Sequence, residues 1–214
     1  MMNTIVPDHP LIAHKLTVLR DHMTQPANFR SIVSELMTLL AYEATRAVPT
    51  QSVTVATPIA PYTGRKLASP VPIVVPILRA GLGMLDGMMA LLPTAEVGFL
   101  GMERNDETLA ITTYANRLPD DCGGRSCFIL DPMVATGSTI IEAIKLLSAR
   151  GARDLVCVSI LAAQAGIDAL EEWTAQAGVD FTMVTAAIDA QLNDHNYIVP
   201  GLGDAGDRMF GTIG

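Results

Sequence analysis

Between residues 71 and 188, strand-like segments alternate with segments whose apolar residues recur every three or four positions. A strand that is apolar on both faces is typical of a sheet covered by helices on both sides, and strands separated by helices pair in parallel. The alternation therefore predicts a doubly wound α/β fold with a mostly parallel sheet. The strand-like segments are 71–78, 95–104, 125–131, 155–163 and 179–188, and the helical ones are 83–92, 138–150 and 165–176.

Two helices and a β-arm precede this core. Residues 11–21 and 29–47 carry apolar residues at helical spacing, and Pro49 ends the second segment. Residues 52–67 are rich in β-branched residues and contain two prolines, which is typical of an edge hairpin. Because no repeat, low-complexity tract or linker separates these parts, we expect one domain over residues 1–214.

The charge of the chain argues against several classes of partner. The net charge is −8, so we expect neither nucleic acid nor an anionic membrane as a partner. The N-terminus lacks the pattern of a signal peptide, and the most apolar segment, residues 70–93, is interrupted by Arg79 and Asp86. Three cysteines without a CxxC motif favour neither a disulfide framework nor a zinc site. We therefore expect a cytoplasmic protein without a membrane span.

The segment FILDPMVATGSTI (128–140) places an acid and a group of small residues between a strand and a helix. At the N-terminus of a helix, unpaired N–H groups and the helix dipole attract anions, and small side chains let a phosphate reach those groups. Thr136, Ser138 and Thr139 can add hydroxyl donors. Asp131 lies where open α/β sheets bind their ligands. The segment predicts a phosphate cradle beside an acid suited to sugar hydroxyls; an ordinary βα turn with a serine or threonine N-cap is the alternative.

Two arginines follow predicted strands. Arg79 ends a buried strand, where a charge needs either a partner or the mouth of a site. A structural ion pair is the alternative for Arg79. Arg104 lies in a run without periodicity, residues 101–114, which predicts either a lid that carries a cation into the site or a solvated loop.

The C-terminal segment YIVPGLGDAGDRMFGT (197–212) is rich in glycine and contains two aspartates. GLGDAG formally matches the dinucleotide motif GxGxxG, but the sequence continues for only eight residues after Gly206, so we expect no dinucleotide site. We expect this segment to lack regular structure; a mobile tail is the alternative to a docked one. The side chains expected to dock it are Tyr197, Ile198, Val199 and Phe210.

An acid with a phosphate cradle, two strand-end arginines and an acidic, glycine-rich tail together resemble a phosphoribosyltransferase, specifically the uracil phosphoribosyltransferase family. The resemblance spans nearly the whole chain, and its most specific part is YIVPGLGDAGDR, which is similar to the family's uracil-binding segment. Ser138 and Asn196 stand where the family usually has glycine, and Glu103 where it commonly has an aromatic residue. Serine keeps its backbone N–H and asparagine tolerates a positive φ, whereas the pattern offers no explanation for Glu103.

The resemblance implies that uracil and 5-phospho-α-D-ribose 1-diphosphate (PRPP) give UMP and diphosphate, with Mg2+ on the diphosphate. It implies catalytic roles for Asp131, Arg104 and Asp204, with Asp204 acting through magnesium or its water shell. The residues implied for PRPP are Arg79, Arg104, Asp131, Pro132, Met133, Val134, Ala135, Thr136, Gly137, Ser138, Thr139 and Asp204. Within a uracil-binding segment over 193–212, the residues implied for uracil are Ile198, Gly203, Asp204 and Ala205.

The resemblance also implies a homodimer or a larger homo-oligomer, and activation by GTP, as occurs for some relatives. Two other functions stay open. A related enzyme could use another base, such as a purine, although GLGDAGDR disfavours it. A non-enzymatic regulator could use the same fold to bind RNA, although the acidic charge argues against it.

Overall fold

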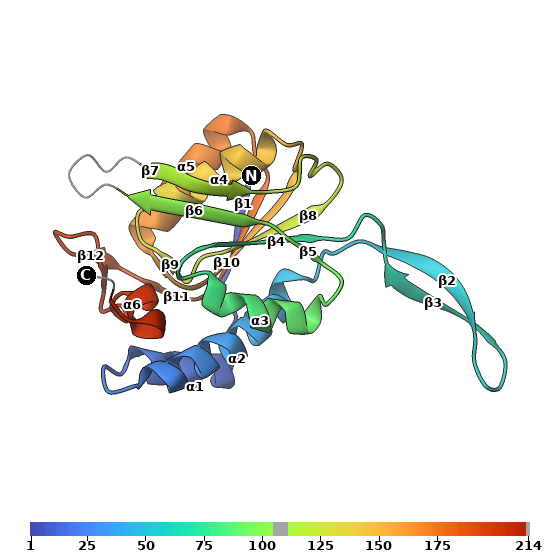
Figure 1. The fold of residues 1–214 in the computed structure, drawn as a ribbon, viewed down its shortest axis with the longest axis horizontal. Coiled ribbons are helices and arrows are strands. Elements are labelled where there is room, and N and C mark those ends of the chain that lie inside the picture. Colours follow the sequence, from blue (N-terminus) through green and yellow to red (C-terminus); the bar gives the residue numbers. More distant parts are fainter. Residues whose placement is uncertain (105–110, 213–214) are drawn as a thin grey trace.

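The computed structural model describes residues 1–104 and 111–212. The strands of its main sheet are β1 (Met2–Ile5), β4 (Ile73–Leu78), β5 (Glu96–Val97), β6 (Phe99–Arg104), β7 (Ile111–Arg117), β8 (Ser126–Leu130), β9 (Met133–Val134), β10 (Asp154–Ala163) and β11 (Phe181–Asp189). Seven of them follow the order β1-β11-β10-β8-β4-β6-β7, while β5 pairs with β4 and β9 pairs with β10 (Figure 1). Of these pairs, only β6 and β7 run antiparallel.

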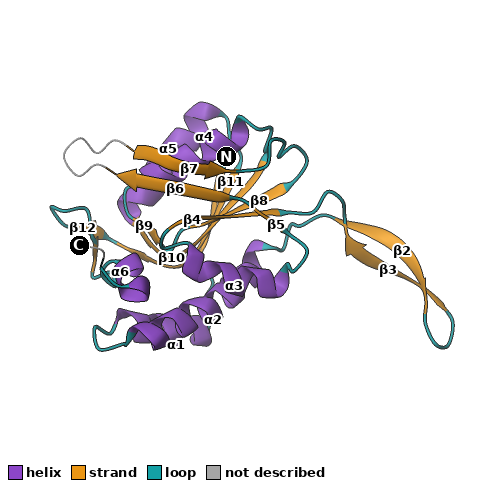
Figure 2. Ribbon diagram, viewed as in Figure 1, coloured by secondary structure: helices purple, strands orange, loops and turns teal. Residues whose placement is uncertain are grey.

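Helices cover both faces of this sheet (Figure 2). One face carries α1 (Pro10–Arg20), α2 (Pro26–Ala44), α3 (Leu82–Leu91) and α6 (Ala205–Phe210), and the other carries α4 (Ser138–Ser148) and α5 (Gln164–Ala177). β10 is apolar throughout because its side chains pack into a core on both faces of the sheet. Val156 and Val158 belong to the core on the α2 side, and Leu155 and Cys157 to the core on the α4 side. The predicted doubly wound α/β fold is confirmed.

Both predicted N-terminal helices are present, and each has a proline in its first turn, where the missing N–H group costs no hydrogen bond. On α2, a stripe at three- and four-residue steps is buried: Phe29, Val33, Leu36 and Leu40. Within residues 1–104 and 111–212, no helix combines the length and the hydropathy that a membrane crossing requires.

The predicted β-arm is an antiparallel hairpin of β2 (Thr50–Ala56) and β3 (Pro61–Leu67). It extends away from the rest of the molecule (Figure 1) and forms a two-stranded sheet of its own. At its tip, Ile59 is 93% exposed. The apolar tip therefore has no contact that would bury it within the described part of this chain.

The sequence pattern misses two strands at the edges of the main sheet. β1 is a short strand beside β11, and β7 begins within residues 101–114, which were expected to form an aperiodic loop. That expectation is wrong for residues 101–104 and 111–114, because β6 extends to Arg104 and pairs with β7; residues 105–110 lie outside the described part. Half-buried and exposed residues alternate along β7, and its inward side chains include Thr113 and Ala115. An edge strand with small or polar inward residues does not resemble the apolar strands of the core.

Candidate active site

The segment predicted as a phosphate cradle lies where the main sheet passes into α4. β9 pairs with β10 immediately before the turn, and Gly137, with φ of 78°, precedes the first helical residue, Ser138. The hydroxyl oxygens of Thr136 and Ser138 lie 3.2 Å apart. A cavity of about 170 Å3, lined by Asp131 and residues 133–137, opens over this turn. The helix N-terminus, the small side chains and the acid therefore meet at one cavity.

Asp131 follows β8 and also lines a second cavity, of about 230 Å3. Burial raises the pKa of Asp131 to about 7, and a hydrogen bond of 3.3 Å from the Met133 N–H opposes this only weakly. Donors that hydrogen-bond to a carboxylate favour its charged form. The hydroxyl groups of a sugar bound in this cavity would supply such donors.

Arg79 directly follows β4 and lines the 230 Å3 cavity together with Asp131 and Asp204. Its Nη2 lies 3.3 Å from Oδ1 of Asp207, so the ion pair that sequence analysis left as an alternative is present. The side chains of the pair are 42% and 38% exposed, and such a pair contributes roughly 0–1 kcal/mol. The bond is thus weak enough to leave the guanidinium available to an anionic ligand.

The glycine-rich tail, residues 197–212, has regular structure, so the expectation that it lacks any is wrong. It contains β13 (Ile198–Val199), which pairs antiparallel with β12 (Gln191–Leu192), and the helix α6. Asp204 is the N-cap of α6, and its Oδ1 accepts a hydrogen bond of 2.8 Å from the Asp207 N–H. The sequence pattern did not predict this helix, because glycine has a low helix propensity and the helix is only six residues long.

The side chains that dock the tail differ from those expected. Ile198 is buried, as predicted, but three expected anchors are exposed: Tyr197, Val199 and Phe210. The residues that pack into the core on the α2 side instead are Leu202, Ala205 and Met209. Apolar character identifies candidates for burial, whereas the turn between β13 and α6 decides which side chains face the core.

Three arginines that sequence analysis missed fasten the tail to the N-terminal helices. Arg30 donates a hydrogen bond of 2.6 Å to the carbonyl oxygen of Met209, and Arg208 donates one of 2.6 Å to that of Asp21. Arg20 makes the third link by donating a hydrogen bond of 2.9 Å to the carbonyl oxygen of Gly201. The first two carbonyl partners are 179 and 187 positions away along the chain, and no local sequence pattern identifies contacts of that range.

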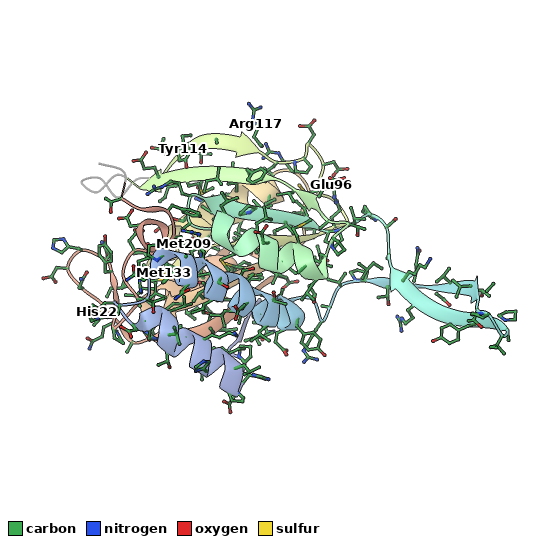
Figure 3. The ribbon with its side chains drawn as sticks, turned by 60° about the horizontal axis from the view of Figure 1, so that its bottom comes forward. His22, Glu96, Tyr114, Arg117, Met133 and Met209 are labelled. Atoms are coloured by element: carbon green, nitrogen blue, oxygen red, sulfur yellow. The ribbon has the colours of Figure 1, made fainter. Side chains whose placement is uncertain are left out.

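A third cavity, of about 530 Å3, lies against the tail and is lined by Met133, Ala135, residues 194–198 and residues 203–205. Asn196 has φ of 60°, so asparagine does adopt the left-handed conformation for which the family usually uses glycine. Met133 lines all three cavities, which therefore form one crevice. Figure 3 shows Met133 well away from the β-arm, whereas Glu96 lies toward it.

Arg104 is the last residue of β6, and its side chain lies outside the described part of the chain, as do residues 105–110. A lid that carries Arg104 into the crevice stays a prediction. Glu103 is exposed and pairs with Thr112 across β6 and β7. Nothing in the structure explains why a glutamate stands there.

Comparison with curated proteins gives matches along nearly the whole chain. The family model for uracil phosphoribosyltransferase matches residues 6–212. The uracil phosphoribosyltransferase of Streptomyces avermitilis is 60% identical over 211 residues, which are 99% of each chain. That of Pseudarthrobacter chlorophenolicus is 60% identical over 213 residues, with full coverage of both chains.

Solved structures agree in fold. The AQ2163 protein from Aquifex aeolicus has a TM-score of 0.89 and 36% identity, over 98% of each chain. The adenine phosphoribosyl transferase from Trypanosoma brucei has a TM-score of 0.54 at 13% identity, covers 91% of this chain and 87% of its own, and shares the fold alone. Given a family match from residue 6 to residue 212 and relatives 60% identical along the chain, this protein belongs to the uracil phosphoribosyltransferase family.

Proposed function

We propose that the crevice transfers the phosphoribosyl group of PRPP to uracil, giving UMP and diphosphate, a reaction of pyrimidine salvage. The observation that carries this proposal is that three adjoining cavities share Met133. One of them opens on a helix N-terminus, the second holds an acid and an arginine, and the third lies against the glycine-rich tail. A phosphorylated sugar bearing a diphosphate and a planar base would use all three.

The donor would lie along the first two cavities. The 5′-phosphate would accept hydrogen bonds from the N–H and hydroxyl groups of residues 135–139, and Asp131 would accept them from the ribose hydroxyls. Arg79 would bind the diphosphate, and Arg104 would close over it. Bond breaking at the anomeric carbon leaves a cation-like ribose and a polyanionic leaving group. Electrostatic stabilisation and alignment would therefore supply most of the catalysis, without a side-chain nucleophile.

Magnesium fits the donor set of this crevice. Asp131 and Asp204 line the same cavity, and carboxylate oxygens are the protein ligands that Mg2+ prefers. The described residues hold no group of three or more acidic, histidine or cysteine side chains suited to a metal ion. Such an ion would therefore take most of its ligands from the diphosphate and water, with Asp204 contacting it directly or through water. When bound, it would neutralise charge on the leaving group.

Uracil would lie in the 530 Å3 cavity, read by main-chain groups around Ile198, Gly203 and Ala205. The cavity lining supports this, because all three residues contribute to it. A backbone N–H facing the 4-oxo group of uracil would oppose the amino group of cytosine, leaving two donors unpaired. Main-chain recognition also fits the composition of the tail, which has neither asparagine nor glutamine between Tyr197 and Arg208.

We further propose that the protein is a homo-oligomer that acts in the cytoplasm. The β-arm supports assembly, since an isolated two-stranded hairpin is at best marginally stable in water and its apolar tip is exposed. The three free thiols fit a reducing compartment. GTP as an activator rests on the family resemblance alone, and a comparison of initial rates with and without GTP tests it.

A diphosphate-release assay with PRPP, Mg2+ and one base at a time tests the proposed reaction. We expect release with uracil and little with cytosine or hypoxanthine. Release with hypoxanthine instead would assign the protein to another base, and release with none of the bases would favour the non-enzymatic alternative.

A further inference from the structure

One part-buried ion pair at the end of the main sheet is not explained by the roles proposed for the crevice. Asp189, the last residue of β11, is 8% exposed, and the side chain of Arg20, in the last turn of α1, is 25% exposed. Both terminal guanidinium nitrogens of Arg20 donate to the carboxylate: Nη1 to Oδ2 at 2.7 Å and Nη2 to Oδ1 at 2.7 Å. This two-point geometry is the strongest form of an arginine–carboxylate contact.

The pair also holds both hydrogen-bonding groups of one residue in the tail. The N–H of Gly201 donates to Oδ2 of Asp189 at 2.9 Å, and the carbonyl oxygen of Gly201 accepts from Nη1 of Arg20 at 2.9 Å. A strand end and a helix end thereby fix the backbone of one residue, through the peptide groups on both sides of its Cα. Neither Arg20 nor Asp189 lines any of the three cavities of the crevice.

Gly201 lies in the turn between Ile198 and Gly203, whose main-chain groups are proposed to bind the base. Its φ is 62°, and a Cβ at this position would lie 2.1 Å from the carbonyl oxygen of Ile198. The chain therefore turns tightly between Ile198 and Gly203, two of the residues proposed to face uracil. A shift of the Gly201 peptide would move these two residues relative to one another.

Electrostatics explain why the pair holds its position. Burial alone would raise the pKa of Asp189, but the hydrogen bonds from Arg20 and from the Gly201 N–H outweigh it and lower that pKa. The carboxylate is thus charged at neutral pH and depends on these donors. Removing one partner would leave the other charged, part-buried and unpaired.

We propose that Arg20 and Asp189 are positioning residues for uracil: their ion pair fixes the Gly201 peptide and, through it, the main-chain groups that read the base. This inference rests on the proposed main-chain recognition of uracil. A role in folding alone would lower stability without changing the choice of base. A positioning role predicts that loss of the pair raises KM for uracil and lowers the preference for uracil over cytosine, while KM for PRPP stays unchanged.

The test compares Asp189→Asn and Arg20→Lys with the matched control Glu96→Gln. Glu96 pairs with the buried Arg125 at 2.8 Å, toward the β-arm and away from the crevice (Figure 3), so its variant also removes a carboxylate from an arginine pair. KM for uracil, KM for PRPP, kcat, and the ratio of kcat/KM for uracil to that for cytosine are measured, with melting temperatures recorded alongside. Arg20→Lys keeps the charge and loses the two-point contact, which provides a milder variant should Asp189→Asn fail to fold.

We expect both variants to raise KM for uracil at least tenfold and to lower the uracil-to-cytosine ratio at least tenfold, with KM for PRPP within about twofold of wild type. Glu96→Gln should leave all four kinetic quantities within about twofold. A lower melting temperature with unchanged KM for uracil and unchanged base ratio in the folded variants would overturn the inference. Failure of the unmodified protein to use uracil at all would instead refute the proposed function.

Discussion

The charge of Asp131 depends on whether the chain is folded. Burial raises the pKa of this carboxyl from an ordinary value of 3.8 to about 7. Between these two values the folded protein retains a proton that the unfolded chain has lost, so the stabilising contribution is present at low pH and is lost as pH rises through 7. Above about pH 7 both states are ionised, and the folded state then carries a part-buried charge.

Asp131→Asn should therefore become progressively more stable relative to wild type as pH rises from 4 to 7. The asparagine stays neutral throughout, whereas the part-buried aspartate is forced to ionise. A shift of about three pKa units corresponds to at most about 4 kcal/mol in the free energy of unfolding. Urea unfolding of both proteins at pH 4, 5.5, 7 and 8 measures the difference in their free energies of unfolding. A difference that stays constant over this range would contradict the burial of the carboxyl.

Asp204 carries two roles that substitution can separate. As the N-cap of α6 it accepts a hydrogen bond from the Asp207 N–H, and asparagine caps a helix about as well as aspartate. Asp204→Asn should therefore lower kcat severely while the melting temperature changes little, because it removes the charge proposed to act near magnesium. Asp204→Ala should add a loss of about 1 kcal/mol in stability. Near-normal turnover of Asp204→Asn with uracil would refute the proposed charge role.

At the scale of elements, the backbone conformation of the tail is the proposed source of base specificity. Gly203 has φ of 81°, which a β-branched residue adopts only with strain. A Cβ on Gly203 would meet only the Arg208 side chain, at 3.6 Å, so the backbone and not the available space is what requires glycine. Its neighbour Leu202 is buried in the core on the α2 side, where only the volume of the side chain matters.

Gly203→Val should abolish the use of uracil, whereas Leu202→Met should be nearly silent in kinetics. The first change forces the main chain off the path that faces the base. The second roughly conserves volume, and such swaps usually cost less than about 1.5 kcal/mol. Steady-state turnover of uracil and cytosine by both variants measures this. Wild-type selectivity in Gly203→Val would rule out main-chain recognition of the base.

The elements divide clearly into those that the sequence predicts and those that it does not. α4 and the core strands β4, β8 and β10 follow from strong local patterns, because each is long or apolar on both faces. β7 and α6 do not, since an edge strand with threonines and a six-residue helix with a glycine carry weak local signals. Tertiary contacts stabilise such elements where local propensity is weak; for α6, one such contact is the hydrogen bond from Arg30 to Met209.

At the scale of the whole molecule, sequence analysis selected residues that lie together in the crevice, but not the residues that hold them there. Asp131, Arg79 and Asp204 were selected as crevice residues, and the structure brings all three to one cavity. The link between Arg20 and Asp189 spans 169 positions, so a single sequence holds no signal for it. The residues proposed to bind a ligand belong to recognisable local motifs, whereas the residues that hold those motifs in place are joined only by the fold.

The central claim is that one crevice binds phosphate at the start of α4 and the base against the tail. A crystal structure of the protein with UMP tests this most directly. We predict phosphate oxygens about 3 Å from the N–H groups of residues 136–139, and the uracil edge at hydrogen-bonding distance from main-chain atoms of residues 198–205. A uracil ring read by side chains, or lying outside the cavity lined by Gly203 and Ala205, would contradict the account.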